Sequence, residues 1–383
     1  MPKTKEPFKV GVLFSKSGQT QAMENSMLKA TLYSIKKVNQ NGGINGRELI
    51  PICYDPSGTL ENYSTLANKL LIEDKVQIIF GCYMSSSRKE VLKVVERQNG
   101  MLCYASQYEG FEFSRNIIYC GAAPNQNSTF LGEYLLQNYG KRFYQVGSDY
   151  IWPRESNRIM SEIVEKNGGQ VVKQKYLKMD ANRVDYDKII QDIKKRQPEV
   201  IFCNFVGEAI VHFYEAYADA GLDPSITPIA SLTTSENDIR EMTNGIAEGH
   251  LTAAPYFQTI KTPENELCVA GFLKEYGDEN RTDMCWEAAY FQVQIVANAL
   301  RKTNSDNIDV LRPAILSTEF QAPQGKVKID LANSHTYLWP RIGKVNNTGL
   351  FDLMQESSVA VKPDPYLINY NPNAWGIKMQ QTR

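Results

Sequence analysis

The chain has 383 residues, of which 42 are basic and 43 acidic, so its formal net charge at pH 7 is −1. A chain of this length exceeds what one hydrophobic core comfortably fills, and two domains are therefore expected. The balanced charge argues against nucleic acid as a direct partner, because phosphate binding needs a concentrated positive field. No apolar run approaches the ~18 residues of a membrane span.

The cysteines and the first residues bear on the compartment. The sequence has 7 cysteines, an odd and widely spaced set in which most lie in or beside apolar runs. This usage fits buried free thiols in a reducing compartment. The first residues lack the apolar core of a secretory signal. We therefore predict a cytoplasmic protein, with a periplasmic or lipid-anchored one as the alternative if a signal peptide has been removed.

The first part of the chain alternates short apolar runs with helical patterns. The expected strands are residues 10–14, 49–54, 78–80, 101–104 and 117–120. Ser87 with Glu90 predicts a capping box at the start of the helix that ends at Asn99-Gly100. Alternation of strand and helix over this length indicates a doubly wound parallel sheet.

The pattern begins again after Pro124. The expected strands are now residues 143–147, 171–176 and 200–203, with helices between them. The element of helix, Asn-Gly-Gly and strand recurs in both halves, at Asn41 and at Asn167. The fold class is therefore predicted to be α/β, with two doubly wound parallel-sheet lobes in tandem.

From about His250 the chain is expected to return from the second lobe to the first. Residues 251–257 predict a strand, residues 286–300 a long helix that covers the first lobe, and 327–329 and 337–342 late, antiparallel strands. The tail from Lys362, with its tyrosines and Trp375, is expected to be irregular but packed. The predicted first lobe comprises residues 1–121 and 255–335, and the second comprises 122–254 and 336–383.

Motifs for catalysis, metals and cofactors are weak. The start of the chain has neither a GxGxxG nor a Walker motif, so no cofactor is expected. The histidines are scattered and no HExxH or CxxC occurs, so no metal site is expected. Ser86 to Lys89 forms an SxxK without its companion motifs, and Cys82 and Cys120 have no partner histidine nearby in the pattern. We therefore predict a binding protein with no catalytic residues.

Hydroxyl-bearing and aromatic residues gather at the predicted strand ends in both halves. Aromatic walls with a few neutral hydrogen-bonding groups suit a small, uncharged, polar ligand. Arg88 and Arg154 lie nearby in sequence, so an amino-acid ligand stays open. The predicted ligand-binding residues are Tyr83, Ser85, Tyr104, Ser106, Tyr150, Trp152, Asn204 and Thr233.

These residues lie in motifs that resemble a known superfamily. The motifs are GCYMSSSRKEVLKVVE, LCYASQYEGFE, GAAPNQN, GSDYIWPRESN, SLTTSE, APYF, QAPQGKVKID and KPDPY. In this order they resemble the type I periplasmic-binding-protein superfamily, of Venus flytrap architecture. Within it they look most like the AmiC-like amide-sensing negative regulators of aliphatic amidase expression. Their relatives are ABC-transporter receptors for urea or short-chain amides. The resemblance covers roughly residues 10–365.

The resemblance implies two lobes that close on a short-chain aliphatic amide, acetamide-like or urea-like. It implies a regulator that sequesters an AmiR-like, RNA-binding antitermination partner until an amide loosens the complex. The alternative is the periplasmic receptor of a urea or amide transporter, a branch that usually has Trp at the position of Tyr83. Two positions depart from the regulator pattern: Ser106 stands where Thr is expected and Trp152 where Tyr is expected. Homo-oligomers stay open, and no membrane partner is expected.

Overall fold

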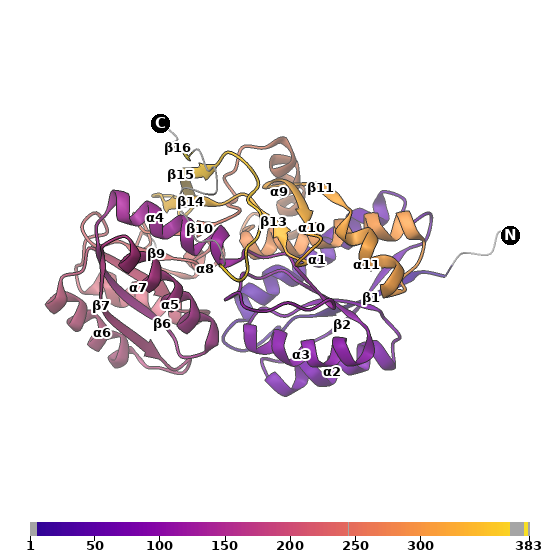
Figure 1. The fold of residues 1–383 in the computed structure, drawn as a ribbon, viewed down its shortest axis with the longest axis horizontal. Coiled ribbons are helices and arrows are strands. Elements are labelled where there is room, and N and C mark those ends of the chain that lie inside the picture. Colours follow the sequence, from indigo (N-terminus) through magenta and orange to yellow (C-terminus); the bar gives the residue numbers. More distant parts are fainter. Residues whose placement is uncertain (1–5, 244, 368–378, 382–383) are drawn as a thin grey trace.

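The computed structural model describes residues 6–243, 245–367 and 379–381, and these form two lobes that lie side by side (Figure 1). Each lobe is a mixed α/β layer structure around a parallel sheet. The predicted fold class is confirmed.

The sheet of the first lobe has the strand order β2-β1-β3-β4-β5, and all its neighbouring strands are parallel. Its strands are nearly continuous apolar runs because helices cover both faces of a doubly wound sheet. The elements are β1 (Phe8–Leu13), α1 (Gln21–Gln40), β2 (Leu49–Tyr54), α2 (Leu60–Ile72), β3 (Ile78–Gly81), α3 (Ser85–Gln98), β4 (Met101–Tyr104) and β5 (Ile117–Tyr119).

The second lobe repeats this topology as β7-β6-β8-β9-β10, and antiparallel strands extend its far edge. Its elements are α4 (Ser128–Asn138), β6 (Arg142–Ser148), α5 (Ile151–Lys166), β7 (Gln170–Leu177), α6 (Arg183–Arg196), β8 (Val200–Asn204), α7 (Glu208–Asp219), β9 (Ile229–Ser231), α8 (Glu236–Glu241) and β10 (Leu251–Ala254). The added strands are β14 (Arg341–Val345), β15 (Phe351–Ser357) and β16 (Met379–Gln381). The predicted second copy is therefore present.

Between β10 and β14 the chain returns to the first lobe. The elements are α9 (Pro263–Tyr276), α10 (Met284–Thr303), α11 (Ile308–Leu316), β11 (Glu319–Ala322), β12 (Gly325–Ile329) and β13 (Thr336–Tyr337). The predicted long helix is α10, and it packs on α1 through the rings of Tyr33, Trp286 and Tyr290. The structure does not test the predicted lobe limits, which stay a prediction.

Three sequence predictions about local structure are wrong. The helix after β3 begins at Ser85, and Ser87 lies inside it, where its hydroxyl donates 2.8 Å to the Met84 carbonyl. The expected strand 251–257 ends at Ala254, before Pro255. The expected strand 337–342 is instead two strands, β13 and β14, with Pro340 between them. A proline has no N–H to offer a ladder, and so it separates paired strands.

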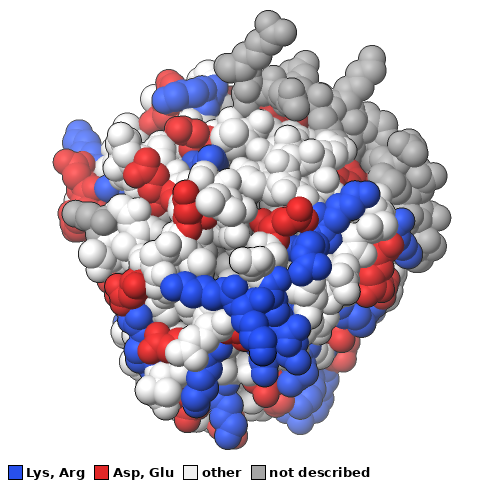
Figure 2. Space-filling view, turned by 90° about the vertical axis from the view of Figure 1, so that its left-hand side faces the viewer, with Lys and Arg blue, Asp and Glu red and all other residues white. Residues whose placement is uncertain are grey.

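The tail is packed as far as Leu367. The Asp364 amide donates 2.7 Å to Asn125, and the Phe111 amide donates 2.9 Å to the Pro365 carbonyl. Trp375 lies outside the described residues. Among those that are described, no helix is long and apolar enough to cross a membrane. Figure 2 shows the outer end of the second lobe, where Lys and Arg side chains gather in a band over the lower half of this face.

Candidate ligand-binding site

A small cavity lies where the carboxyl ends of strands from both lobes meet. Its free volume is about 10 Å³. It is lined by Tyr83, Ser85, Ser106, Gln107, Tyr150, Trp152, Val206 and Thr233. Open α/β sheets bind ligands outside the carboxyl ends of their strands, and this cavity occupies that position in both lobes at once. In the closed arrangement seen here, its free space is about that of one water-sized group.

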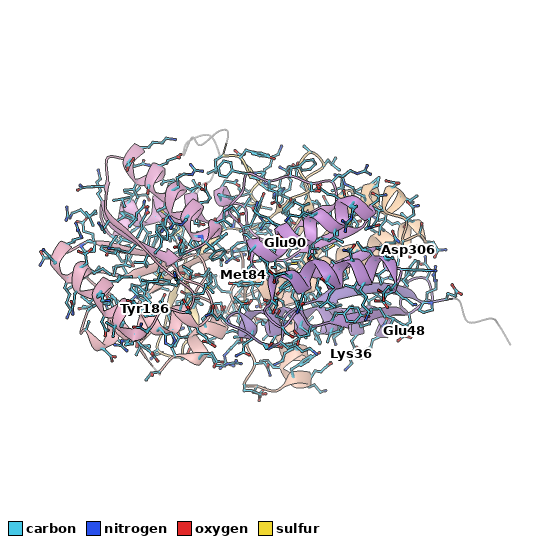
Figure 3. All side chains as sticks on the ribbon, turned by 90° about the horizontal axis from the view of Figure 1, so that it is seen from below. Lys36, Glu48, Met84, Glu90, Tyr186 and Asp306 are labelled. Carbon is cyan, nitrogen blue, oxygen red and sulfur yellow. The ribbon has the colours of Figure 1, made fainter. Side chains whose placement is uncertain are left out.

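The lining residues come from loops that the two sheets fix in place. Cys82 has a φ of 67°, which turns the chain sharply between β3 and Tyr83. Ser106 follows β4, and Tyr150 and Trp152 stand at the start of α5, after β6. Figure 3 shows Met84, the neighbour of Tyr83, at the junction between the lobes. Both lobes therefore contribute to one wall of side chains.

Most of the residues predicted from sequence line this cavity together. They are Tyr83, Ser85, Ser106, Tyr150, Trp152 and Thr233. Tyr104 lies beneath the lining, where its hydroxyl donates 2.6 Å to the Tyr83 carbonyl. Asn204 lies outside it, because its carboxamide turns into the second lobe and donates 2.8 Å to Asn157. Tyr104 supports the site and Asn204 belongs to the packing of the second lobe.

Gln107 and Val206 also line the cavity, and sequence reasoning missed both. Gln107 joins the lobes, since its carboxamide donates 3.0 Å to the Leu232 carbonyl and accepts from the Cys285 thiol. Both residues stand in the loops that follow strands β4 and β8. Their position after a predicted strand could have indicated both residues, but neither is a hydroxyl-bearing or aromatic residue, the types expected in the site.

Arg88 is the cation nearest to the cavity, and two carboxylates of the protein already hold it. Its side chain is 0% exposed, and it lies 3.0 Å from Glu109 and 2.9 Å from Glu112. Ser85, which lines the cavity, donates to Glu109 and accepts from Arg88. Burial alone would raise the pKa of Glu112, but Arg88 and Lys89 hold that pKa below its ordinary value. A ligand carboxylate would therefore find no unpaired charge at Arg88.

The groups that do face the cavity are neutral. Burial raises the pKa values of the Tyr83 and Tyr150 phenols well above the ordinary one, so both hydroxyls stay protonated. Neither hydroxyl bonds to another of the described residues, and both are available to a guest. Arg154, the other candidate for a carboxylate, lies on the surface and pairs with Asp149 at 2.7 Å. The lining suits an uncharged polar ligand.

The cysteines and histidines that could serve in catalysis or metal binding have structural roles. Burial raises the pKa values of the Cys82 and Cys120 thiols, that of Cys120 to about 12, which disfavours the nucleophilic thiolate. His250 accepts from the Ile229 amide at 2.9 Å, and burial lowers its pKa to about 3. His335 stacks on Tyr119. Across the described chain no group of three His, Cys, Asp or Glu residues is placed to hold a metal ion.

The lobes touch each other around the cavity. The Gln19 carboxamide donates 2.8 Å to the Met179 carbonyl, and the Asn237 carboxamide donates to Asp283, which also accepts from Ser26 at 3.0 Å. Gly207 meets the first lobe so closely that a Cβ there would lie 2.1 Å from the Gln19 carbonyl oxygen. The structure is thus a closed form, in which the two lobes enclose the site.

Two similar lobes with a ligand-sized cleft between the carboxyl ends of their strands are the arrangement of a solute-binding protein. The family model described as the periplasmic binding protein domain matches residues 8–372. The chain belongs to this family, whose type I members have the two-lobed fold described above. Its members are binding proteins.

Curated relatives are distant. The leucine-, isoleucine-, valine-, threonine- and alanine-binding protein of Pseudomonas aeruginosa is 22% identical over 78% of this chain and 79% of that one. A limonene hydroxylase of Geobacillus stearothermophilus is 28% identical, but over only 32% of this chain and 22% of its own length. The chain thus spans about a fifth of that relative, and the match carries no activity to this protein.

Solved structures share the fold. The solute-binding protein of an ABC transporter from Rhodopseudomonas palustris BisB5, in complex with 3,4-dihydroxybenzoic acid, has a TM-score of 0.82, 21% identity and coverage of 90% of this chain and 95% of that one. The branched-chain amino acid receptor LivJ of Streptococcus pneumoniae, in complex with isoleucine, has a TM-score of 0.80, 15% identity and coverage of 90% and 98%. At these identities the likeness shows the fold alone.

Proposed function

We propose that this protein binds urea or a short aliphatic amide between its lobes and performs no chemistry on it. The observation that carries this proposal is the neutral lining of the small cavity beside an Arg88 that Glu109 and Glu112 already neutralise. A primary amide offers one acceptor and two donors, which phenol and hydroxyl groups match without net charge.

For the cellular role, we favour the receptor of an ABC transporter, which the sequence offered as the alternative to a regulator. The support comes from the similar solved structures, since both that are named above are the substrate-binding proteins of transporters. Closure on the ligand would then present both lobes together to a permease.

An amide-responsive negative regulator that sequesters an antiterminator is the second candidate. Its support is the thiol set: all 7 cysteines are free, and Cys82, Cys103, Cys120, Cys203 and Cys285 are buried. Buried free thiols are typical of proteins in reducing compartments, and this favours the cytoplasm.

The ligand class is tested by calorimetry with urea, acetamide, propionamide, leucine and 4-hydroxybenzoate. We expect heat from the first three only, and a loss of about tenfold in affinity in Tyr150→Phe, which removes one unpaired hydroxyl. Binding of leucine or 4-hydroxybenzoate in preference to every amide would overturn the proposal.

The two roles are separated by the partner that the tagged protein retains. Co-purification with an RNA-binding antiterminator, weakened by acetamide, would establish the regulator and contradict the receptor. Amide uptake that depends on this gene and on a permease would do the reverse.

A further inference from the structure

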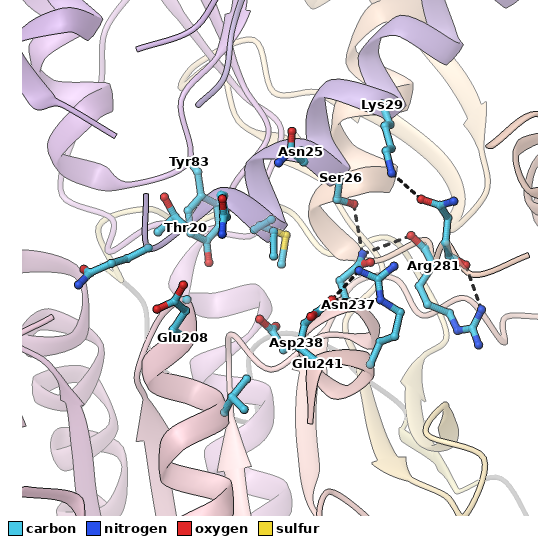
Figure 4. Close-up of a pocket in the computed structure, with 18 of the residues that line it drawn as sticks. Thr20, Asn25, Ser26, Lys29, Tyr83, Glu208, Asn237, Asp238, Glu241 and Arg281 are labelled. Atoms are coloured by element: carbon cyan, nitrogen blue, oxygen red, sulfur yellow. Dashed lines mark hydrogen bonds and ion pairs between the residues drawn. The ribbon is translucent and has the colours of Figure 1, made fainter. Parts of the chain in front are cut away.

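A second and much larger cavity lies between the lobes, bordered by α1, α7, α8 and the loop after α9 (Figure 4). We name it the α1–α8 cavity. Its volume is about 470 Å³, within the usual range for small-molecule sites. Tyr83 borders both this cavity and the small one. The amide proposed for the small cavity does not occupy this larger space.

Lys29 and Arg281 bring uncompensated positive charge to the α1–α8 cavity. Lys29 donates 2.6 Å to the Asn280 side-chain oxygen, and Arg281 donates 2.8 Å to the Asp278 carbonyl. Within the described part of the chain, neither forms an ion pair with a carboxylate. Arg240, by contrast, is paired with Glu241 at 2.7 Å. Two cations without a carboxylate partner favour an anionic group, and arginine suits a carboxylate well.

The opposite charge lies on the other side of the same cavity. Glu208, on the first turn of α7, makes no ion pair with any described residue. Figure 4 shows Glu208 directed toward Thr20 and Tyr83, away from Lys29 and Arg281. One oxygen of the nearby Asp238 carboxylate, Oδ2, accepts from the Ser235 amide and hydroxyl at 2.9 and 2.7 Å, and burial raises the pKa of this carboxyl to about 7. Glu208 is therefore the carboxylate left to meet a cation.

We propose that the α1–α8 cavity is a second ligand site, for a small zwitterion of about dipeptide size. Its carboxylate lies against Lys29 and Arg281, and its ammonium group against Glu208. The charge separation across the cavity selects a molecule that carries both groups. Because α1 belongs to one lobe and α7 and α8 to the other, an occupant also favours the closed form. The inference does not rest on the amide proposed for the small cavity.

The test is calorimetry with glycylglycine as the probe and N-acetylglycine as the matched molecule without an ammonium group. We expect the protein to bind glycylglycine, and the Lys29→Ala/Arg281→Ala variant to bind it at least about tenfold more weakly. Glu208→Gln should lower the affinity for glycylglycine and leave the affinity for N-acetylglycine unchanged. Acetamide affinity should be the same in both variants as in the unchanged protein, which also reports that they are folded.

Three results would overturn this inference. They are the absence of heat from millimolar glycylglycine, glycylglycine binding that the Lys29 and Arg281 substitutions leave intact, and competition between glycylglycine and acetamide for one site. Failure of acetamide alone to bind would contradict the proposed amide function and leave this site standing, because the glycylglycine titration contains no acetamide and its charged ends are tested by the variants at Lys29, Arg281 and Glu208.

Discussion

At the scale of single residues, Arg88 decides what charge the small cavity accepts. A fully buried guanidinium is stable only with partners, and Glu109 and Glu112 supply them. Lys89, half-exposed, adds a second cation 3.2 Å from Glu112. The cluster is balanced by the protein itself, so a charged ligand would leave one of these groups uncompensated.

Replacing Arg88 by Met is expected to destabilise the protein strongly. The variant leaves the buried Glu109 and the partly buried Glu112 with the half-exposed Lys89 as their remaining cation. Removing one partner of a buried ion pair typically costs about 3–5 kcal/mol. Urea unfolding followed by circular dichroism measures the change in the free energy of unfolding. Arg97→Met is the control, because Arg97 is exposed on the same helix and, among the described residues, its side chain hydrogen-bonds to Asn68 alone. Equal stability of the two variants would contradict the role assigned to Arg88.

Two substitutions of one methyl group test the size of the small cavity. Ser106→Thr adds a methyl to a cavity that has no room for it, and we expect a loss of about tenfold in acetamide affinity. Thr233→Ser removes one while keeping the hydroxyl that donates 2.8 Å to the Phe205 carbonyl. Calorimetry of Thr233→Ser should therefore show a higher ratio of propionamide affinity to acetamide affinity than in the unchanged protein. Unchanged affinities in both variants would place the ligand elsewhere.

At the scale of elements, the sequence predicted the parallel strands well because continuous apolar runs and Gly-rich ends are local signals. It did not predict β9 or β15. β9 has three residues, and β15, with the sequence FDLMQES, is held by antiparallel pairing with β14 from a neighbouring segment. The predicted start of the helix after β3 is three residues late, since Ser87 resembles an N-cap residue but its hydroxyl donates to the Met84 carbonyl from inside the helix.

The sequence predicted which loops form the candidate site, but not the contacts that their side chains make. Six of the predicted residues line the small cavity because they follow strands whose ends must meet. Asn204 also follows a strand, yet its contact with Asn157 depends on how β8 and α5 pack, which no local pattern records. The pairing of Arg88 with Glu109 and Glu112 is likewise tertiary.

Helix α8 is expected to make stability depend on pH. Burial raises the pKa of Glu236 to about 8 and that of Asp238 to about 7. The unfolded carboxyls titrate near pH 4, so the folded state holds the extra protons between these values. Stability from this source is complete below about pH 4 and is lost as pH rises through about 8. The buried carboxyls of α8 are therefore expected to lower the free energy of unfolding at alkaline pH.

Glu236→Gln should flatten this dependence. The urea midpoint of the unchanged protein is expected to fall between about pH 6 and pH 9, and that of Glu236→Gln to fall less, with Asp238 supplying the remainder. Glu241→Gln, an exposed position on the same helix, is the control and should keep the original slope. A slope unchanged by Glu236→Gln would show that this carboxyl does not hold a proton in the fold.

At the scale of the whole molecule, closure depends on how near the lobes come. Gly207 has a φ of 60°, and a Cβ there would lie 2.1 Å from the Gln19 carbonyl oxygen of the facing lobe. Gly207→Ala should keep the lobes apart, lower amide affinity by at least about tenfold and enlarge the radius of gyration measured by X-ray scattering with ligand present.

Gly221→Ala is the matched control for this effect. Gly221 has a φ of 65° in the same lobe, but a Cβ there would meet nothing within 4 Å. It therefore imposes similar backbone strain without obstructing closure, and its amide affinity should stay near that of the unchanged protein. If both variants lost affinity alike, strain rather than closure would be the cause.

The central claim is that the guest between the lobes is neutral. Acetamide and acetate have nearly the same shape and differ in charge, so a calorimetric titration of each into the purified protein tests the claim most directly. We predict that acetamide binds and that acetate binds at least about a hundredfold more weakly, because Arg88 has no charge left to offer it. Acetate binding as tight as that of acetamide would contradict the account.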